Sequence, residues 1–379
     1  MAEFNKIFIV AGEESGDLHG SALVAELLNR KRNLAFFGIG GNRMKEAGVS
    51  LIHHVDEMAL MGFTEVINKY IFLKSAFDDC IKAVKKNSPA RAILIDYPGF
   101  NLRLAKKLKE LKIPITYFIP PQLWAWREGR IKIIKECIDQ ILSIFPFEEE
   151  WYKNRGVGAI FVGHPFIDQE KSSVSREEYF YKCGIPQEKT VIGLFPGSRQ
   201  QEVDKHVDVM FGAIKKLNDN GISSIGLVGK APDVIIKKNR NVKNIFLTDE
   251  PLKALLYSDV AIVSSGTISL ETALFDIPSV VIYKMSTSSW LIAKALSKVK
   301  YVSMTNLIAG NNIYPELLQK EATTDNIVER IKPMITNRSV RIDIIKELIS
   351  VRKQLGPPGA ISRAAEKIID SLNSNTGQS

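Results

Sequence analysis

Cysteine is scarce in this sequence. The 379 residues include three cysteines, Cys80, Cys137 and Cys183, which lie far apart along the chain. An odd number of widely spaced cysteines argues against both a disulfide framework and a zinc site. We therefore expect a cytoplasmic protein without a structural metal.

Long apolar runs are missing as well. The apolar run nearest the N-terminus covers only residues 7–11, which is too short for a signal peptide and predicts a first β-strand. No segment approaches the roughly 20 apolar residues that a helix needs to cross a bilayer. Any contact with a membrane is expected to be peripheral.

Several metal and cofactor motifs are absent. The chain has no Asp-x-Asp triplet, no clustered Cys/His set, no Walker-type G-x-x-x-x-G-K and no G-x-G-x-x-G. Residues 38–41, Gly-Ile-Gly-Gly, match only part of the last motif. The sequence thus calls for neither a metal ion nor a dinucleotide, and we expect no cofactor.

Charge gives a weaker indication. The net charge is +9, and basic residues gather at 101–112, with five Lys or Arg and one acid, and at 284–300, with four lysines and no acid. Such an excess suits nucleic acid, anionic lipid or a phosphorylated substrate equally well. Because no nucleic-acid-binding module is recognised, we do not expect a nucleic-acid partner.

The order of the apolar runs predicts the fold. Short β-branched runs alternate with helical patterns on both sides of a polar stretch at 168–189, which is typical of parallel sheets covered by helices. We predict an α/β protein with two doubly wound, Rossmann-like domains, residues 1–167 and 168–345, facing each other across a cleft. Helices in residues 346–379 are expected to cross back toward the first domain and to end in a disordered tail.

Two loops of the second domain suggest a phosphate site. Gly197-Ser198-Arg199 and Ser265-Gly266-Thr267 each follow a predicted strand and precede a helical pattern. Amides at helix starts, glycines that permit close approach and an arginine suit a pyrophosphate. The alternative interpretation of a single such loop is a turn with a surface arginine, and the sequence favours neither for one loop taken alone. Glu271 lies one turn into the second helix, where it suits ribose hydroxyls or simply complements the helix dipole.

The first domain carries polar residues in the loop after its first strand. Residues 12–20 include Glu14, Ser15, Asp17 and His19. Such a density of polar groups at the carboxyl end of a strand indicates a functional site in an α/β fold. A compatible alternative is that Ser15 or Asp17 caps the following helix.

Asp96 is the predicted general base. It ends the apolar run at 92–95, where its carboxylate is placed to remove a proton from a sugar hydroxyl. Asp17 and Glu14 are rival carboxylates. His19 is either a further base or a substrate ligand.

Aromatic and apolar stretches have two interpretations each. Residues 117–126 place Trp124 and a second tryptophan in a proline-rich loop, which suits either a wall for a sugar ring or acyl chain, or core packing. Residues 58–73 are rich in large apolar groups, and 290–302 add three lysines. Both stretches suit contact with anionic lipid, or ordinary amphipathic core helices. The turn at 163–165 is predicted to be a hinge.

Taken together, these motifs resemble the bacterial lipid-A-disaccharide synthase family. The resemblance runs through nearly the whole chain as an ordered series, which is far more specific than any single loop. The matching segments are GEESGD at 12–17, GIGG at 38–41, MGFTEV at 61–66, IDYPGFN at 95–101, PPQLWAW at 120–126, VGHPF at 162–166, PGSR at 196–199, SGTISLE at 265–271 and NLIAGNNIYPELLQ at 306–319.

The resemblance implies a GT-B fold and a metal-independent, inverting glycosyltransferase of lipopolysaccharide biosynthesis in Gram-negative bacteria. UDP-2,3-diacylglucosamine would be the donor and 2,3-diacylglucosamine 1-phosphate, or lipid X, the acceptor. The products would be a β-1,6-linked disaccharide phosphate and UDP. We expect a cytoplasmic protein that binds peripherally to the anionic surface of the inner membrane, and a homodimer is compatible with this expectation.

The family's roles can be carried onto the matching positions. Those that would hold UDP are Arg199, Ser265, Gly266, Thr267 and Glu271, and those that would line the donor site are Asn306, Glu316 and Gln319. The acceptor and catalytic side would include Ser15, Asp17, Met61, Asp96 and Asn101. Where many relatives have Pro-Asp-Phe-Asn, this chain has Pro98-Gly99-Phe100-Asn101, so Asp96 has to serve if the family base is that second aspartate.

Rival functions come from the same fold. A UDP-GlcNAc 2-epimerase or a peptidoglycan glycosyltransferase would use a similar UDP-sugar site. Incubation with UDP-diacylglucosamine and lipid X distinguishes these enzymes from a lipid-A-disaccharide synthase.

Overall fold

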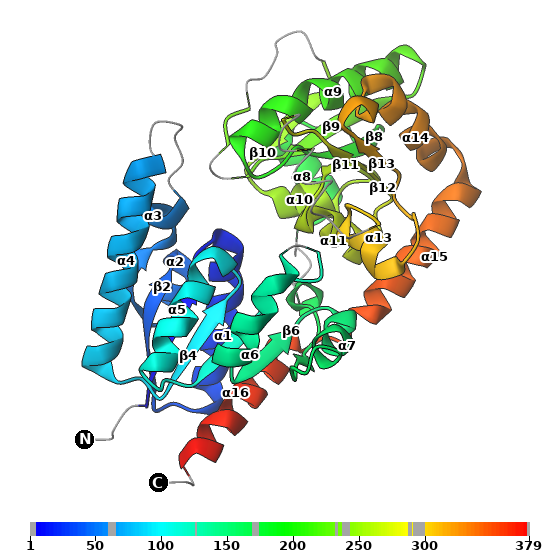
Figure 1. The fold of residues 1–379 in the computed structure, drawn as a ribbon. Coiled ribbons are helices and arrows are strands. Elements are labelled where there is room, and N and C mark those ends of the chain that lie inside the picture. Colours follow the sequence, from blue (N-terminus) through cyan, green and yellow to red (C-terminus); the bar gives the residue numbers. More distant parts are fainter. Residues whose placement is uncertain are drawn as a thin grey trace. The chain divides into compact units, whose positions relative to one another are not determined.

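The computed structural model describes residues 5–59, 66–125, 127–168, 174–231, 234–236, 243–286, 290 and 300–376. The chain forms two compact units (Figure 1). Unit 1 comprises Met1–Asp168 together with Leu355–Ser379, and unit 2 comprises Gln169–Gln354.

Unit 1 is built on a seven-stranded parallel sheet in the order β3-β2-β1-β4-β5-β6-β7. The strands are β1 (Asn5–Ala11), β2 (Leu34–Gly40), β3 (Val49–His54), β4 (Arg91–Ile95), β5 (Ile115–Phe118), β6 (Gln140–Ser143) and β7 (Ile160–Phe161). The helices are α1 (Glu14–Arg30), α2 (Asn42–Glu46), α3 (Val55–Ala59), α4 (Val66–Asn87), α5 (Pro98–Glu110), η1 (Glu128–Arg130), α6 (Ile131–Cys137), α7 (Pro146–Lys153), η2 (Pro165–Asp168) and α16 (Ala360–Thr376).

Unit 2 is built on a six-stranded parallel sheet in the order β10-β9-β8-β11-β12-β13. The strands are β8 (Thr190–Phe195), β9 (Ser224–Gly229), β10 (Ile245–Thr248), β11 (Val260–Ser264), β12 (Ser279–Tyr283) and β13 (Glu316–Leu318). The helices are α8 (Arg176–Cys183), α9 (Gln200–Asp219), α10 (Pro251–Leu256), α11 (Thr267–Leu274), α13 (Met304–Ala309), η3 (Gln319–Glu321), α14 (Thr324–Thr336) and α15 (Arg338–Gln354).

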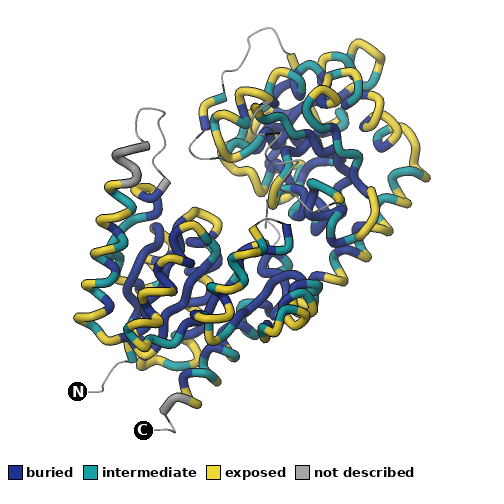
Figure 2. The backbone as a smooth tube through the Cα atoms, viewed as in Figure 1, coloured by how far each residue is buried: buried dark blue, intermediate teal, exposed yellow. Residues whose placement is uncertain are grey.

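The central strands are buried on both faces, as their continuous apolar runs predict. Every residue of β4 and β11 is buried, and Figure 2 shows buried strands inside each unit with exposed residues on the surrounding helices. The prediction of two doubly wound, Rossmann-like α/β domains is confirmed.

Each sheet has one point where the strand order reverses. In unit 1 it lies between β1 and β4, which pair with Ala11 beside Ile95. In unit 2 it lies between β8 and β11, which pair with Val263 beside Phe195. Ligands of open α/β sheets bind at the carboxyl ends of the strands at such a reversal. The fold therefore places a candidate site in each unit before any side chain is considered.

The last helix belongs to unit 1. α16 packs against α1, and its backbone and Ser371 side chain accept hydrogen bonds from Gln140 Nε2, at 2.9 Å from Lys367 O and 2.8 Å from Ser371 Oγ. The sequence-based boundary at residue 345 falls inside α15, which packs against α11, α13 and α14 of unit 2. The chain returns to unit 1 at Leu355.

None of the helices within the described residues is both long and apolar enough to span a membrane.

Candidate active site

Two glycine-bearing loops meet at the strand reversal of unit 2. Gly197 has φ +128° and Gly266 has φ +148°, values that side chains with a Cβ rarely adopt. Ser198, Gly266 and Thr267 are exposed, and the Arg199 side chain is 66% exposed. The sheet therefore brings the two predicted phosphate loops to the ends of adjacent strands, with exposed residues at both helix starts.

A carboxylate that sequence reasoning missed lies under the first loop. A Cβ on Gly197 would lie 2.6 Å from Glu202 Oε2 and 2.9 Å from Glu202 Cβ, and together with the φ of +128° this contact favours glycine at position 197. Burial raises the pKa of Glu202, although the Arg199 charge and the amides of Arg199 and Ser198 act in the opposite direction. A glutamate at the third position of a helix was the available signal, because it commonly reaches back to the helix start.

His206 was also missed, and it joins this loop to the end of β12. The side chain is fully buried, with Nδ1 2.7 Å from Pro196 O and Nε2 2.9 Å from the Lys284 backbone nitrogen. Because the carbonyl only accepts and the amide only donates, the ring is the neutral tautomer with its proton on Nδ1. Burial and the charges of Lys284 and Lys205 lower the pKa of His206. The neutral ring thus fixes the loop before Arg199.

Protonation of His206 should weaken nucleotide binding to this loop. An N–H on Nε2 would face the Lys284 amide, and a buried unpaired donor costs about 1–3 kcal/mol. We expect the UDP affinity of the wild type to fall at a pH below the usual histidine range. His206→Gln keeps an acceptor that does not titrate and should reduce this fall, while His206→Ala should weaken affinity at every pH.

Calorimetric titration of both variants and the wild type with UDP, between about pH 5 and pH 8, measures the pH dependence of the affinity. Protonation of UDP itself affects all three proteins equally, so differences among their profiles report on residue 206. Identical pH profiles for the wild type and His206→Gln would contradict the assignment.

Asn306 and Glu316 form one hydrogen-bonded network at the start of α13. Glu316 accepts from the Val302 and Ser303 amides at 2.9 Å each, and Asn306 Nδ2 donates to Glu316 Oε1 at 2.9 Å. Asn306 also fixes the backbone of Tyr314, because its Nδ2 donates to the Tyr314 carbonyl and its Oδ1 accepts from the Tyr314 amide. These two predicted donor residues therefore shape the site by holding its backbone.

The same network reaches the second loop and β12. Ser265 Oγ donates to Val302 O at 3.2 Å. Gln319, with its amide oriented to satisfy both bonds, donates to Met285 O at 3.2 Å and accepts from Met285 N at 3.3 Å. Ser265, Asn306, Glu316 and Gln319 are thus linked through the segments that follow β11, β12 and β13.

Glu271 is partly enclosed within α11. Burial raises its pKa to about 7, and no hydrogen bond of its carboxyl is found within the described part of the chain. A surface acid that merely complements the helix dipole would be solvated and ionised. The raised pKa fits a group that is held ready for a ligand hydroxyl.

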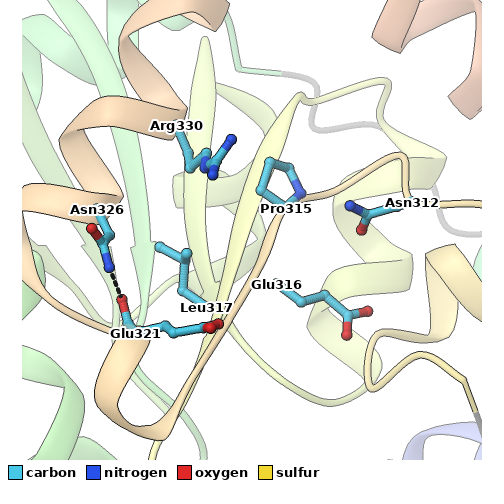
Figure 3. Close-up of a pocket in the computed structure, with 7 residues that line it drawn as sticks. All are labelled: Asn312, Pro315, Glu316, Leu317, Glu321, Asn326 and Arg330. Carbon is cyan, nitrogen blue, oxygen red and sulfur yellow. Dashed lines mark hydrogen bonds between the residues drawn. The ribbon is translucent and has the colours of Figure 1, made fainter.

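A pocket of about 330 Å³ lies between β13 and α14 (Figure 3). Its lining residues are Asn312, Pro315, Glu316, Leu317, Glu321, Asn326 and Arg330. Asn326 Nδ2 closes one side by donating to Glu321 O at 2.8 Å. Of the predicted donor residues only Glu316 lines it, so this pocket is distinct from the glycine-bearing loops.

In unit 1, Asp96 stands at the strand reversal in an unusual backbone conformation. Asp96 and Tyr97 both have φ 45°. The Asp96 carbonyl accepts from Asn101 Nδ2 at 2.8 Å and from Tyr117 Oη at 2.6 Å, which holds this conformation. A Cβ at Gly12 would overlap the Tyr97 ring, so only glycine lets the two loops approach.

The Asp96 carboxyl is suited to accept a proton. Burial and, as a smaller effect, the charge of Glu13 together raise its pKa to about 6. A base with a pKa near the working pH is the most effective in proton transfer. The sequence alone did not point to Glu13, because its effect on Asp96 depends on the pairing of β1 with β4. Asn101, which is fully buried, has an Oδ1 atom without a hydrogen-bond partner among the described residues.

Asp17 has a structural task. Its Oδ1 accepts from the Gly41 and Met44 amides at 2.6 and 3.0 Å, and its Oδ2 accepts from the Arg43 amide at 3.2 Å. The carboxylate therefore anchors the start of α2, not that of α1 as the capping alternative supposed. Capping by Ser15 is contradicted too, because α1 begins after Glu13 without a side-chain cap.

The other predicted residues after β1 differ in their exposure to solvent. Glu14 and Ser15 are exposed on the first turn of α1. His19 is buried against Phe166, with ring centroids 5.3 Å apart, and burial lowers its pKa to about 4. A histidine of such low basicity is neutral at physiological pH, which favours packing or ligand contact over general base catalysis.

Trp124 joins an aromatic cluster beside the site. Its ring meets Phe147 edge to face at 4.9 Å, and Nε1 donates to Glu148 Oε1 at 3.1 Å. Burial raises the pKa of Glu148 to about 8. Trp124 is thus fixed by packing and by one hydrogen bond. Met61 and the second tryptophan, Trp126, lie outside the described residues.

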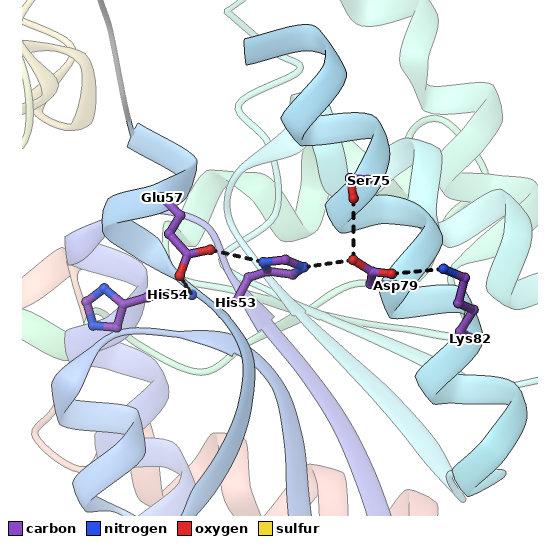
Figure 4. A network of polar contacts seen from close by, with 6 residues as sticks. All are labelled: His53, His54, Glu57, Ser75, Asp79 and Lys82. Atoms are coloured by element: carbon purple, nitrogen blue, oxygen red, sulfur yellow. Dashed lines mark hydrogen bonds and ion pairs between the residues drawn. The ribbon is translucent and has the colours of Figure 1, made fainter. Parts of the chain in front are cut away.

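A polar network at the edge of unit 1 ties β3, α3 and α4 together (Figure 4). His53 lies between two carboxylates, with Nδ1 3.0 Å from Glu57 and Nε2 3.3 Å from Asp79. Lys82 adds an ion pair to Asp79 at 3.1 Å. Since β3 is the edge strand farthest from β4 on its side of the sheet, this network supports the fold and not the predicted site.

The stretches considered for membrane contact are only partly described. Residues 60–65 and 291–299 lie outside the described residues. Ile71 on α4 is 60% exposed. In the described residues, no group of three or more His, Cys, Asp or Glu side chains is arranged to hold a metal ion.

Known proteins resemble the chain in sequence and in fold. The family model described as lipid-A-disaccharide synthetase matches residues 7–365. The lipid-A-disaccharide synthase of Myxococcus xanthus is 36% identical, over 97% of either chain, and that of Syntrophus aciditrophicus is 38% identical, over 95% of this chain and 96% of the relative.

Solved structures share the fold at low identity. The UDP-GlcNAc 2-epimerase of Neisseria meningitidis bound to UDP-GlcNAc has a TM-score of 0.68 at 12% identity and covers 96% of this chain and 100% of its own. The calicheamicin glycosyltransferase CalG4 has a TM-score of 0.62 at 12% identity and covers 98% of each chain. These two structures bear on the GT-B fold alone. From the match over residues 7–365 and the identities above 30%, the chain belongs to the lipid-A-disaccharide synthetase family.

Proposed function

We propose that this chain condenses UDP-2,3-diacylglucosamine with 2,3-diacylglucosamine 1-phosphate, giving a β-1,6-linked disaccharide 1-phosphate and UDP. The observation that carries the proposal is the family match over residues 7–365. The two strand reversals support it, because each presents polar groups suited to one half of the reaction.

Unit 2 would bind the donor. Arg199 and the amides at the starts of α9 and α11 supply positive charge for the diphosphate, in loops whose glycines permit close approach. Glu271 would accept from the ribose hydroxyls. Stabilisation of the leaving diphosphate by fixed donors lowers the barrier to glycosyl transfer, because these donors need no reorganisation during reaction.

Unit 1 would activate the acceptor. Asp96 would take the proton of the 6-hydroxyl while the oxygen attacks the anomeric carbon and the bond to the diphosphate breaks, which inverts the configuration. Asn101 and Tyr117 position Asp96 through its carbonyl. Ser15, His19, Met61 and Trp124 are proposed to contact the acceptor.

The acyl chains make a membrane surface the source of both substrates. We propose a peripheral association with the inner membrane from the cytoplasm. The apolar and lysine-bearing stretches at 58–73 and 290–302 are the proposed contacts.

A defined assay tests the function. Purified protein, both glycolipids and detergent micelles should yield a disaccharide phosphate identified by mass, with one UDP released per product, and a chelator should leave the rate unchanged. Supply of UDP-GlcNAc alone tests the rival epimerase. Absence of the disaccharide, or formation of an epimerised nucleotide sugar, would refute the proposal.

A further inference from the structure

Three arginines of unit 1 gather beside the strand that carries Tyr117. Arg103 lies in the second turn of α5, which follows β4, while Arg127 and Arg130 lie in the segment that follows β5. β4 and β5 are neighbours in the sheet, and α5 packs against α6, which continues directly from η1. The topology therefore brings the three side chains to the same part of the carboxyl edge.

Three acids near these arginines are paired with other cations. Glu128, between the two arginines, pairs with Arg155 through bonds of 2.6 and 2.9 Å. On α5 and before β6, Lys107 pairs with Glu110 and Lys109 with Asp139. Across the ranges that the structure describes, no ion pair is found for any of the three arginines.

The three positive charges act on one another. Burial lowers the pKa of the Arg130 guanidinium, and the charges of Arg127 and Arg103 lower it further. Close like charges without a counter-ion destabilise the apo protein, and an anion that binds among them removes this cost. Guanidinium groups are suited to phosphate because their planar N–H groups can form two parallel bonds to its oxygens.

The cluster also lies close to the proposed base. Arg130 acts electrostatically on Tyr117, whose hydroxyl donates to the Asp96 carbonyl at 2.6 Å. A phosphate held here would belong to a molecule within reach of Asp96, which argues for a substrate group over a distant lipid headgroup.

We propose that Arg103, Arg127 and Arg130 form a binding site for the phosphate monoester of the acceptor. The site fixes the end of the sugar opposite to the reacting hydroxyl, so that the 6-hydroxyl is presented to Asp96. This inference rests on the proposed function, because it takes the acceptor to be a sugar 1-phosphate.

Binding of two acceptor glycolipids tests the site without turnover. The 1-phosphate and the same lipid without phosphate are titrated in neutral detergent micelles against Asp96→Asn protein, alone and combined with Arg103→Gln or Arg130→Gln. We expect each arginine variant to weaken binding of the phosphorylated lipid about tenfold or more, since a hydrogen bond to a charged group contributes about 1.5–3 kcal/mol. Binding of the lipid without phosphate should stay unchanged.

Arg32→Gln is the matched control. Arg32 is exposed and lies between α1 and β2, at the amino edge of the same sheet. The substitution therefore removes one positive charge from unit 1 far from the three arginines, and binding of both lipids should stay unchanged. Arg103 is exposed on a helix, so Arg103→Gln should fold even if Arg130→Gln does not.

Three results would overturn the proposal. The first is equal binding of both lipids by the Asp96→Asn protein, and the second is an equal loss of affinity for both lipids in the arginine variants. The third is that the arginine variants bind both lipids normally and differ only in how well they sediment with vesicles of anionic phospholipid. The last would assign the cluster to membrane phosphates. The proposed function fails separately, if the wild type makes no disaccharide while these binding differences persist.

Discussion

Asp96→Asn should lower kcat roughly 10²–10⁴-fold, the usual contribution of a general base, while UDP affinity stays unchanged. Asparagine is nearly the same size and tolerates the left-handed conformation at φ 45° better than most residues. The variant therefore removes the proton acceptor without straining the loop. Steady-state kinetics of disaccharide formation and calorimetric titration with UDP measure the two quantities.

The pH dependence gives this prediction a second readout. A base works only when it is deprotonated, so kcat/KM of the wild type should fall as the pH is lowered through about 6, the pKa of Asp96. The residual activity of Asp96→Asn should lack this fall. Because burial raises the pKa of Glu271 to about 7, Glu271→Gln serves to identify any contribution of that carboxyl to the pH profile.

Stability separates a catalytic loss from a folding defect. The pKa of Asp96 is raised in the folded protein, so its contribution to stability is greatest at low pH and is lost as the pH rises through about 6. At pH 8 the asparagine variant should thus be at least as resistant to urea as the wild type. Asp17→Asn, which loses an acceptor for the α2 amides, should instead unfold about 1–3 kcal/mol more easily. A selective loss of kcat in Asp17→Asn, with full activity in Asp96→Asn, would reassign the base.

Arg199→Ala should weaken UDP binding about 10- to 100-fold, the range expected when one or two hydrogen bonds to a charged phosphate are lost. The side chain is 66% exposed and stands 4.0 Å from Glu202, so it makes no close ion pair that its removal would break. Arg199→Lys keeps the charge but loses the planar pair of donors, and should fall between the wild type and alanine. Titration with UDP at fixed ionic strength gives the three dissociation constants.

Arg338→Ala is the control for charge loss in unit 2, since Arg338 is exposed at the start of α15. It should bind UDP as the wild type does. Equal affinities of the wild type and Arg199→Ala would remove Arg199 from the donor site.

The fold could be predicted because the central strands consist almost entirely of apolar residues. In β4 and β11 four consecutive positions are apolar, residues 92–95 and 260–263, which is the pattern of strands buried on both faces. The loops after β1, β4, β8 and β11 stood out for the same reason, because glycine and polar residues interrupt continuous apolar runs. Sequence order could then place these loops at the carboxyl edge without any knowledge of contacts.

The sequence could not predict which side chains contact residues on other strands and helices. His206 lies in a helix pattern where a buried histidine looks like ordinary packing, and its contact with Lys284 joins residues 78 positions apart. Asp17 resembled a helix cap or a catalytic acid, yet it binds amides of α2, which follows the next strand. Likewise the helical pattern across residue 345 has no internal break, so the end of unit 2 had to come from packing.

The return of α16 to unit 1 bears on how the protein is made. Buried residues of this helix, including Ala364, Ala365 and Ile368, form part of the core of unit 1. A ribosome delivers residues 1–168 first, yet the apolar surface of α1 stays uncovered until all of unit 2 has been synthesised. The nascent N-terminal unit thus depends on a late segment for completion, and chaperones would have the whole of that interval in which to act on it.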